Sequence, residues 1–175
     1  MIEMHPFGNF VPQNTQYLFL GSFTGRRPLE NEKDSDYDWF FGTKRNQFWT
    51  IMEGVYNLKL QNKQEKQRLF EKIGLAITDI ILSCERKEGN NLDENLTNIT
   101  FNSPAIVNII KENKIKTIFF SSHFAHSLFR KQFKRIIQNH PEIKLITLPS
   151  PSPRYAAMSK SEKIVKYKEL LPQIN

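Results

Sequence analysis

The sequence predicts an α/β protein, a three-layer sandwich in which a central, mainly parallel four-stranded sheet is flanked by helices. Two observations predict this fold class. Short apolar runs alternate along the chain with segments of helical periodicity. Each run is apolar along its whole length, which is typical of strands buried on both faces of a parallel sheet. Because the 175 residues show no linker-like change of composition, we expect a single domain over residues 1–175.

The first predicted elements are a strand and two helices. The strand is the apolar run YLFLG at 17–21, which ends in glycine. A helix is expected at 46–56, because apolar residues recur there at positions i, i+3, i+4 and i+7. These residues are Phe48, Ile51, Met52 and Val55. A second, more polar helix is expected at 63–73 and ends before Gly74.

The middle of the chain contains the second strand, a long loop and the third helix. The run LAITDIILS at 75–83 predicts the strand. A loop rich in Asn, Gly and charged residues follows and extends to about residue 100. Ser103 and Pro104 then indicate a helix start, with serine as the N-cap and proline in the first turn.

The last part of the chain repeats the alternation of strand and helix. Strands are expected at 116–122 (KTIFFSS) and at 143–149 (IKLITLP), with a helix at 123–137 between them. The final helix opens with a capping box formed by Ser159 and Glu162 and runs to about Leu171.

The chain is basic, with a net charge of +7 and a sequence pI of about 9.5. A basic surface favours partners that carry phosphate groups. A composition rich in Lys and Asn raises the pI equally well without any partner, and charge alone leaves both interpretations open.

Several classes of protein are excluded by composition. Cys84 is the single cysteine, so an internal disulfide framework and a Cys-rich zinc or iron–sulfur site are excluded. There is no run of ~18 apolar residues that could span a membrane and no signal-peptide pattern. We therefore expect a cytoplasmic monomer that uses no metal and no other cofactor.

Three loops are expected at the carboxyl ends of strands, at 21–45, 84–100 and 149–158. In open α/β sheets, ligands bind outside these strand ends. The three loops carry unusual residue types, including paired aromatics, glycines and a run of alternating Ser and Pro. We therefore expect the functional site to be built from them.

Four segments of these loops and of the N-terminus carry a resemblance to a known family. They are HPFGNF (5–10), FFGTKRNQFW (40–49), SCERKEGNNLD (83–93) and LPSPSP (148–153). In this order they resemble motifs of the uracil-DNA glycosylase superfamily, and they look most like its hypoxanthine-DNA glycosylase branch. The likeness runs from His5 to about Ala157.

The resemblance implies a DNA-repair enzyme whose partner is double-stranded DNA containing a damaged base. Such an enzyme flips a deaminated base (hypoxanthine, uracil or xanthine) out of the duplex and hydrolyses its N-glycosidic bond, leaving an abasic site. The extruded base needs an aromatic platform and polar contacts to its edge. The oxocarbenium-like sugar needs negative or dipolar groups and an oriented water.

The resemblance implies two catalytic residues, Asn46 and Ser150. Many relatives carry a catalytic Asn or Asp two residues after the first Gly of the motif that follows the first strand. In this chain that motif is GSFTG (21–25), and the position is occupied by Phe23. Asn46 matches the Asn of the hypoxanthine-acting branch, so we expect it to orient water or the sugar; the same residue also stands where a helix N-cap would. Ser150 replaces a His or Asn of other branches, and its hydroxyl cannot supply positive charge.

Four residues are expected to bind the base. Phe41 matches the stacking aromatic of the family, with core packing as its alternative role. Backbone groups of Ser22 and Phe23 would face the base edge. Asp79 interrupts an apolar strand, so it is either half-exposed or buried with a hydrogen-bond partner.

Six residues are expected to contact DNA. Arg154 and Tyr155 would form the wedge that fills the vacated space in the base stack, and Ser152 would contact phosphate. Lys44, Arg45 and Arg86 supply cations for the phosphates. For Arg86, a solvated charged loop is the alternative.

Two other classes of function remain open from the sequence. One is a non-catalytic module that binds damaged DNA or nucleotides, because Phe23 and Ser150 depart from the usual catalytic residues. The other is an α/β enzyme that acts on a small nucleotide.

Overall fold

The central sheet consists of four parallel strands. The computed structural model describes residues 1–24, 37–87 and 92–174. The strands lie in the order β3-β2-β6-β7, and all neighbouring pairs are parallel. Their bounds are β2 Tyr17–Gly21, β3 Leu75–Asp79, β6 Thr117–Phe120 and β7 Lys144–Thr147. The predicted four-stranded parallel sheet is confirmed.

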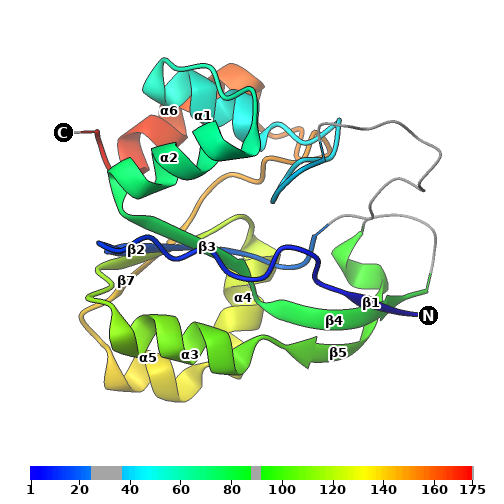
Figure 1. Cartoon of the computed structure of the whole chain (residues 1–175). Helices are drawn as coiled ribbons and strands as arrows, with labels where there is room; N and C mark the ends of the chain where they lie inside the picture. Colours follow the sequence, from blue (N-terminus) through cyan, green and yellow to red (C-terminus); the bar gives the residue numbers. More distant parts are fainter. Residues whose placement is uncertain (25–36, 88–91, 175) are drawn as a thin grey trace.

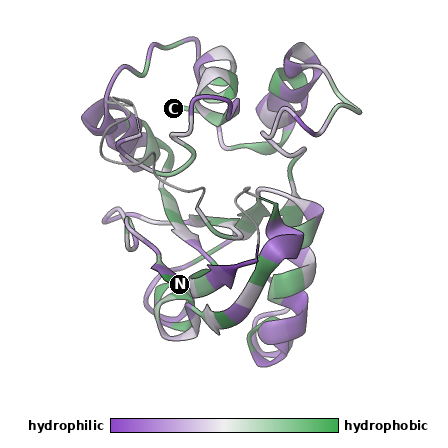
Figure 2. Ribbon diagram, turned by 90° about the vertical axis from the view of Figure 1, so that its right-hand side faces the viewer, coloured by the Kyte–Doolittle hydropathy of each residue, from purple (hydrophilic) through white to green (hydrophobic). Residues whose placement is uncertain are grey.

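Helices cover both faces of this sheet (Figure 1). One layer contains α1 (Phe48–Tyr56), α2 (Lys63–Ile73) and α6 (Lys160–Leu170). The other contains α3 (Ser103–Glu112), α4 (His123–Gln132) and α5 (Lys134–Asn139). Along β2 the buried residues alternate between the two cores: Phe19 packs with the first layer, and Leu18 and Leu20 pack with the second. In Figure 2 the hydrophobic colour therefore concentrates in the strands between the helix layers.

The strand expected at 75–83 is in fact two strands in two sheets. β3 ends at Asp79, and β4 (Ile81–Arg86) begins after Ile80. Ile80 N–H donates to the Gly21 carbonyl, and Ile81 N–H donates to the Ser22 carbonyl. The chain then leaves the central sheet. The expectation of one strand was wrong because the run stays apolar across the bend.

A second sheet of three antiparallel strands lies beside the first, in the order β1-β4-β5. β5 (Leu96–Phe101) and the short 3-10 helix η1 (Asp93–Asn95) lie in the region that was expected to be a loop, and β1 (Ile2–Met4) was not expected at all. Both strands pair with β4: β5 forms a hairpin with it across residues 87–95, and β1 reaches it from the N-terminus, a pairing that local composition does not reveal. Residues 25–36 of the first loop and 88–91 of the second lie outside the described residues.

Three helix boundaries also differ from the prediction. α1 begins at Phe48, two residues after the expected start. The N-cap of α3 is Asn102 rather than Ser103. The helix expected at 123–137 is divided at the buried Phe133 into α4 and α5. The capping box that opens α6 is confirmed.

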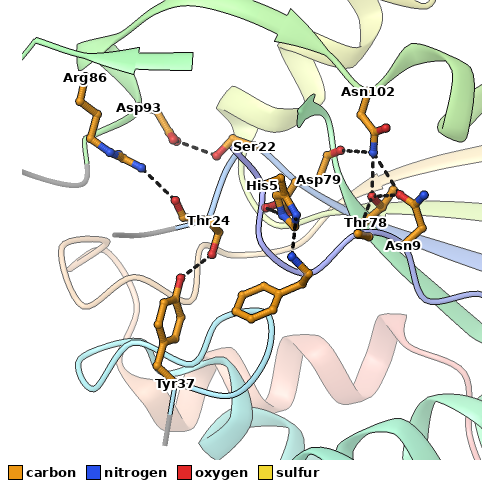
Figure 3. A network of polar contacts seen from close by, with 12 residues as sticks. His5, Asn9, Ser22, Thr24, Tyr37, Thr78, Asp79, Arg86, Asp93 and Asn102 are labelled. Atoms are coloured by element: carbon orange, nitrogen blue, oxygen red, sulfur yellow. Dashed lines mark hydrogen bonds and ion pairs between the residues drawn. The ribbon is translucent and has the colours of Figure 1, made fainter. Parts of the chain in front are cut away.

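The Asn102 side chain does not cap its helix, because it binds the end of β3 instead. Its Nδ2 donates to Thr78 Oγ1 at 2.9 Å, to Asn9 Oδ1 at 3.1 Å and to the Asp79 carbonyl at 3.2 Å. Thr78 Oγ1 also donates to Asn9 Oδ1 at 2.6 Å. This polar cluster, visible in Figure 3, fixes the carboxyl end of β3 against the N-terminal segment.

No helix among the described residues is both long enough and apolar enough to cross a membrane.

Candidate active site

A cavity of about 280 Å³ opens at the carboxyl ends of the parallel strands. All four strands contribute to it: residues 22–24 follow β2, Asp79 ends β3, Ser121 and Ser122 follow β6, and residues 150–154 follow β7. The segment before α1 and Asp93 of η1 complete the wall. The pocket therefore lies where parallel α/β sheets bind their ligands.

Most of the residues expected at the site line this one pocket. They are Ser22, Phe23, Phe41, Arg45, Asn46, Asp79, Ser150, Ser152 and Arg154. Phe41 and Ser150, which are 109 positions apart in the numbering, face the same cavity. Three other expected residues, Lys44, Arg86 and Tyr155, are not part of its wall.

Asp79 is buried, and its hydrogen-bond partner is His5. The His5 Nε2 atom lies 2.9 Å from Asp79 Oδ2, and each side chain is 4% exposed. The Phe7 N–H donates to His5 Nδ1 at 3.3 Å, so the ring proton is on Nε2 and is donated to the carboxylate. Of the two possibilities left open by the sequence, the buried and hydrogen-bonded one is confirmed. Figure 3 shows this pair beside the polar cluster of β3.

Gly21 has no side chain, and the Asp79 and Phe41 side chains occupy the space beside it. It pairs with Asp79 across the last position of the β2–β3 ladder. A Cβ atom at Gly21 would overlap Asp79 Oδ1 and would lie 3.3 Å from Phe41 Cζ. The absent side chain thus leaves room for two walls of the pocket.

The Phe41 ring lies between the pocket and the core. It packs against Phe48 with ring centroids 4.5 Å apart and edge-on against Phe19 at 5.7 Å. Its backbone φ is +56°, a conformation that few residues other than glycine adopt. Strain of this kind persists only where the surroundings enforce it, and it clusters at functional sites. The ring therefore contacts the core and also presents a surface to the cavity, and its stacking on a base stays a prediction.

Asn46 lines the pocket and also starts the chain into α1. Its Oδ1 accepts a hydrogen bond from the Phe48 N–H at 2.8 Å. The side-chain amide NH₂ group is then the part that remains for a water or a substrate atom. The N-cap of α1 is Gln47, so the N-cap position considered for Asn46 was wrong by one residue, and its role in orienting water or the sugar stays a prediction.

Hydrogen bonds from α6 and from the start of α1 hold the loop LPSPSP (148–153) in place. The Lys163 ammonium is 1% exposed and donates to the Ser152 carbonyl and to Gln47 Oε1, each at 3.0 Å. Gln47 N–H donates to the Pro151 carbonyl at 2.9 Å, and the Tyr167 hydroxyl donates to the Pro149 carbonyl at 2.7 Å. Burial lowers the pKa of Lys163. These bonds fix both sides of the pocket relative to each other.

We expect Lys163→Met to lower the free energy of unfolding by about 1–3 kcal/mol, because the Ser152 carbonyl and Gln47 Oε1 lose a charged donor. Denaturant unfolding measures this change. Lys166→Met is the matched control on the same helix, since Lys166 is exposed and pairs with the exposed Glu169; its effect should stay within about 0.5 kcal/mol. Equal effects of the two substitutions would show that Lys163 does not hold the loop.

Asp93 joins the pocket from η1, beside Ser22. The Ser22 hydroxyl donates to Asp93 Oδ1 at 2.8 Å (Figure 3). Burial raises the pKa of Asp93, the Ser22 hydrogen bond lowers it, and the nearby Asp79 carboxylate raises it further. Two acidic side chains thus face one cavity, and burial is the main reason that the pKa of Asp93 lies above its ordinary value.

Arg86 has internal partners. Its Nε donates to Glu3 Oε2 at 2.9 Å, and its Nη2 donates to the Thr24 carbonyl at 2.9 Å. The guanidinium lies 5.5 Å from the Phe23 ring centroid, and its side chain is 2% exposed. The phosphate-binding role expected for Arg86 does not fit this position, because its charge is already paired and covered.

Tyr155 and Lys44 lie outside the pocket wall. The half-buried Tyr155 ring lies 5.5 Å from the Lys163 ammonium, which holds it against the protein. Lys44 is exposed beside the pocket residue Arg45. Arg45 and Arg154 are also exposed, so the mouth of the cavity carries two cations.

Some site residues were not predicted from the sequence. His5 lies within the segment HPFGNF but was given no role, and Asp93 ends the segment SCERKEGNNLD. Ser121 and Ser122 were placed at the end of a strand without being recognised as a fourth loop. The available signal was their position, since polar residues directly after a buried strand reach the carboxyl edge of the sheet.

Within the described part of the chain, no group of three or more His, Cys, Asp or Glu residues is arranged to hold a metal ion.

The chain was compared with known proteins. No known family profile matches the sequence, and no curated protein matches it. Among solved structures, it is similar to the solution NMR structure of a "putative Uracil DNA glycosylase" from Methanosarcina acetivorans. The two share 21% sequence identity with a TM-score of 0.65, and the match covers 97% of this chain and 99% of the other. The protein therefore has the uracil-DNA glycosylase-like fold, with its pocket at the carboxyl edge of the sheet.

Proposed function

We propose that this protein is a monofunctional DNA glycosylase that removes a deaminated base from double-stranded DNA. It hydrolyses the N-glycosidic bond and leaves an abasic site. Hypoxanthine is the proposed first substrate, with uracil and xanthine as further members of the same class. The fold that it shares with the archaeal protein supports this proposal, and so does the resemblance of its loop motifs.

The observation that carries the proposal is the composition of the pocket at the carboxyl ends of the parallel strands. An aromatic ring, an amide and two acidic side chains face a cavity of about 280 Å³. Pockets for drug-sized ligands measure ~300–1,000 Å³, so this volume suits one base. The exposed Arg45 and Arg154 at the mouth suit the phosphates on either side of a flipped nucleotide.

Each group has a role in the proposed reaction. Phe41 stacks on the extruded base, and the backbone of Ser22 and Phe23 contacts its edge. The Asn46 amide orients the attacking water or the sugar, with the Ser150 hydroxyl across the cavity. The Asp79 carboxylate contributes negative charge that stabilises the oxocarbenium-like sugar.

A panel of duplexes tests the proposal. Each duplex carries one hypoxanthine, uracil or xanthine, and the purified protein is added in excess for a single turnover. Cleavage of the strand after alkali treatment reports abasic sites. If every lesion remains intact at all pH values between 5 and 9, the proposal is wrong.

A second candidate is a non-catalytic module that binds damaged DNA. It is favoured by the hydrogen bond from Phe48 N–H to Asn46 Oδ1, because this bond would give Asn46 a purely structural role. Tight binding to a lesion duplex without loss of the lesion would support this candidate. Measuring the binding at several salt concentrations also separates duplex recognition from binding of a small nucleotide, since phosphate contacts give a steep salt dependence.

We expect Phe41→Ala to weaken productive binding of the flipped base by ~1–3 kcal/mol, the range for loss of one stacking contact. Titration of the single-turnover rate against protein concentration measures the change. The free energy of unfolding is measured in parallel, because the ring also contacts Phe19 and Phe48. If the folded variant keeps both affinity and rate, the ring serves only to pack the core.

A further inference from the structure

One step of the proposed reaction has no assigned group, namely the stabilisation of the departing base. Ser150 stands in the loop after β7, and a hydroxyl neither carries positive charge nor is acidic enough to donate its proton. Arg86 is paired with Glu3 and is buried. A base that leaves as an anion needs a proton donor or a cation beside it, and the two cations of the pocket, Arg45 and Arg154, are exposed at its mouth.

We propose that Asp93 is the general acid of this site, and that it protonates a ring nitrogen of a departing deaminated purine. This inference rests on the proposed glycosylase function and narrows it to purines, since N7 of hypoxanthine is an exposed ring acceptor that uracil lacks. General acid catalysis of this kind contributes ~10²–10⁴-fold to a rate.

The position of Asp93 supports this role. Asp93 lines the same cavity as Phe41 and Asn46. The Ser22 hydroxyl donates to Oδ1, so a proton on this carboxyl group belongs on Oδ2, which has no partner among the described residues. The hydrogen bond to Oδ1 therefore orients the side chain, and Oδ2 is available to a ligand.

The surroundings of Asp93 raise its pKa above that of a free aspartate, mainly through burial and in part through Asp79. Asp79 faces it from the end of β3, where it accepts the His5 proton. Two acidic groups in one cavity disfavour double ionisation, and burial acts in the same direction. Arg86 from β4 opposes this effect, but its charge is shared with Glu3. Arg45 and Arg154 lie on the exposed side of the same pocket. A pair of acidic groups whose environments differ in this way is the usual arrangement for an acid and a stabilising carboxylate.

The proposed step conserves atoms and charge. The proton moves from Asp93 Oδ2 to N7 of the purine, and the bond between C1′ and N9 breaks with its electron pair going to the base. Water adds its oxygen to C1′, and the proton that this water releases returns through solvent to the Asp93 carboxylate. The neutral base, the 1-hydroxy sugar and the original carboxylic acid are the products.

The experiment measures single-turnover excision of hypoxanthine against pH for wild-type protein, Asp93→Asn and Glu94→Gln. Glu94 is the exposed neighbour of Asp93 in η1 and serves as the matched control. We expect the wild-type rate to fall as pH rises above the pKa of Asp93, because the acid form is lost. Asp93→Asn should be ~10²–10⁴-fold slower, and its rate should not fall in this pH range. Glu94→Gln should match the wild type in both rate and pH dependence. A duplex with 7-deazahypoxanthine, which has no N7 acceptor, should be cleaved slowly by all three proteins.

The outcomes separate this inference from the proposed function. If the wild-type protein is active and Asp93→Asn has the same rate, or shows the same fall in rate at high pH, Asp93 is not the general acid. The proposed glycosylase function would still stand. Absence of wild-type excision on every lesion would overturn both. If Asp93→Asn does not fold, the carboxyl ¹³C shift of Asp93 is titrated in the wild-type protein. A pKa at or below ~3.9, the value of free aspartate, would also overturn the inference.

Discussion

Asn46→Ala is expected to slow the chemical step of base excision by ~10²-fold or more, the scale for loss of one group directed at a transition state. Asn46 lines the pocket, and its Oδ1 is engaged by the Phe48 N–H, which leaves the amide NH₂ group for a water or a substrate atom. Removal of the side chain leaves the attacking water without this orienting contact. Single-turnover kinetics with saturating protein measure the step directly.

The hydrogen bond to Phe48 requires a control, because alanine removes both ends of the amide. Asn46→Ser keeps a side-chain oxygen that can accept from a backbone N–H near a helix start. We expect this variant to recover the stability lost in Asn46→Ala but not its rate. Recovery of the rate by serine would instead give Asn46 a structural role and would favour the non-catalytic candidate.

Gly21→Ala is expected to abolish most of the excision activity while the protein still folds. The new Cβ atom would overlap Asp79 Oδ1 and press on Phe41 Cζ at 3.3 Å, so two walls of the pocket must move. Overpacking of this kind costs ~1–3 kcal/mol in stability. A displacement of ~1 Å at a catalytic group can cost ~10²-fold in rate. Single-turnover rates and denaturant unfolding measure the two effects separately.

A double-mutant cycle with Asp79→Ala tests this explanation. If the methyl group acts by displacing the Asp79 carboxylate, the double variant should be little slower than Asp79→Ala alone. Multiplication of the two single effects would mean that Gly21→Ala acts through Phe41 or through the backbone of β2. The cycle therefore identifies which wall of the pocket the glycine protects.

The sequence determined the central architecture because its patterns are local. Apolar runs such as 17–21 predicted buried parallel strands. The capping box at Ser159 predicted the start of α6 from four residues alone. The loop motifs around Asn46 and Ser150 likewise identified segments that the structure brings to one pocket. Where a periodic pattern or a capping motif lies within one short segment, the sequence was sufficient.

The second sheet could not be predicted for the opposite reason. β1 and β5 are short, partly exposed strands that exist because each pairs with β4. The bend at Ile80, which divides one apolar run between two sheets, is fixed by carbonyl groups of Gly21 and Ser22 nearly 60 positions earlier. The N-cap of α3 was misassigned because the Asn102 side chain is recruited by Thr78 and Asn9.

By itself the sequence determined the layered fold, the four parallel strands of the central sheet, and the loops that would hold a site. Only the tertiary structure decided how these loops act together: His5 donates to Asp79, Asp93 joins Ser22, and Arg86 turns inward to Glu3. These pairs join residues 71–83 positions apart in the chain. Such contacts decide which side chains remain available to a ligand. A polar group that is buried must find a hydrogen-bond partner, and that partner is fixed only when the chain has folded.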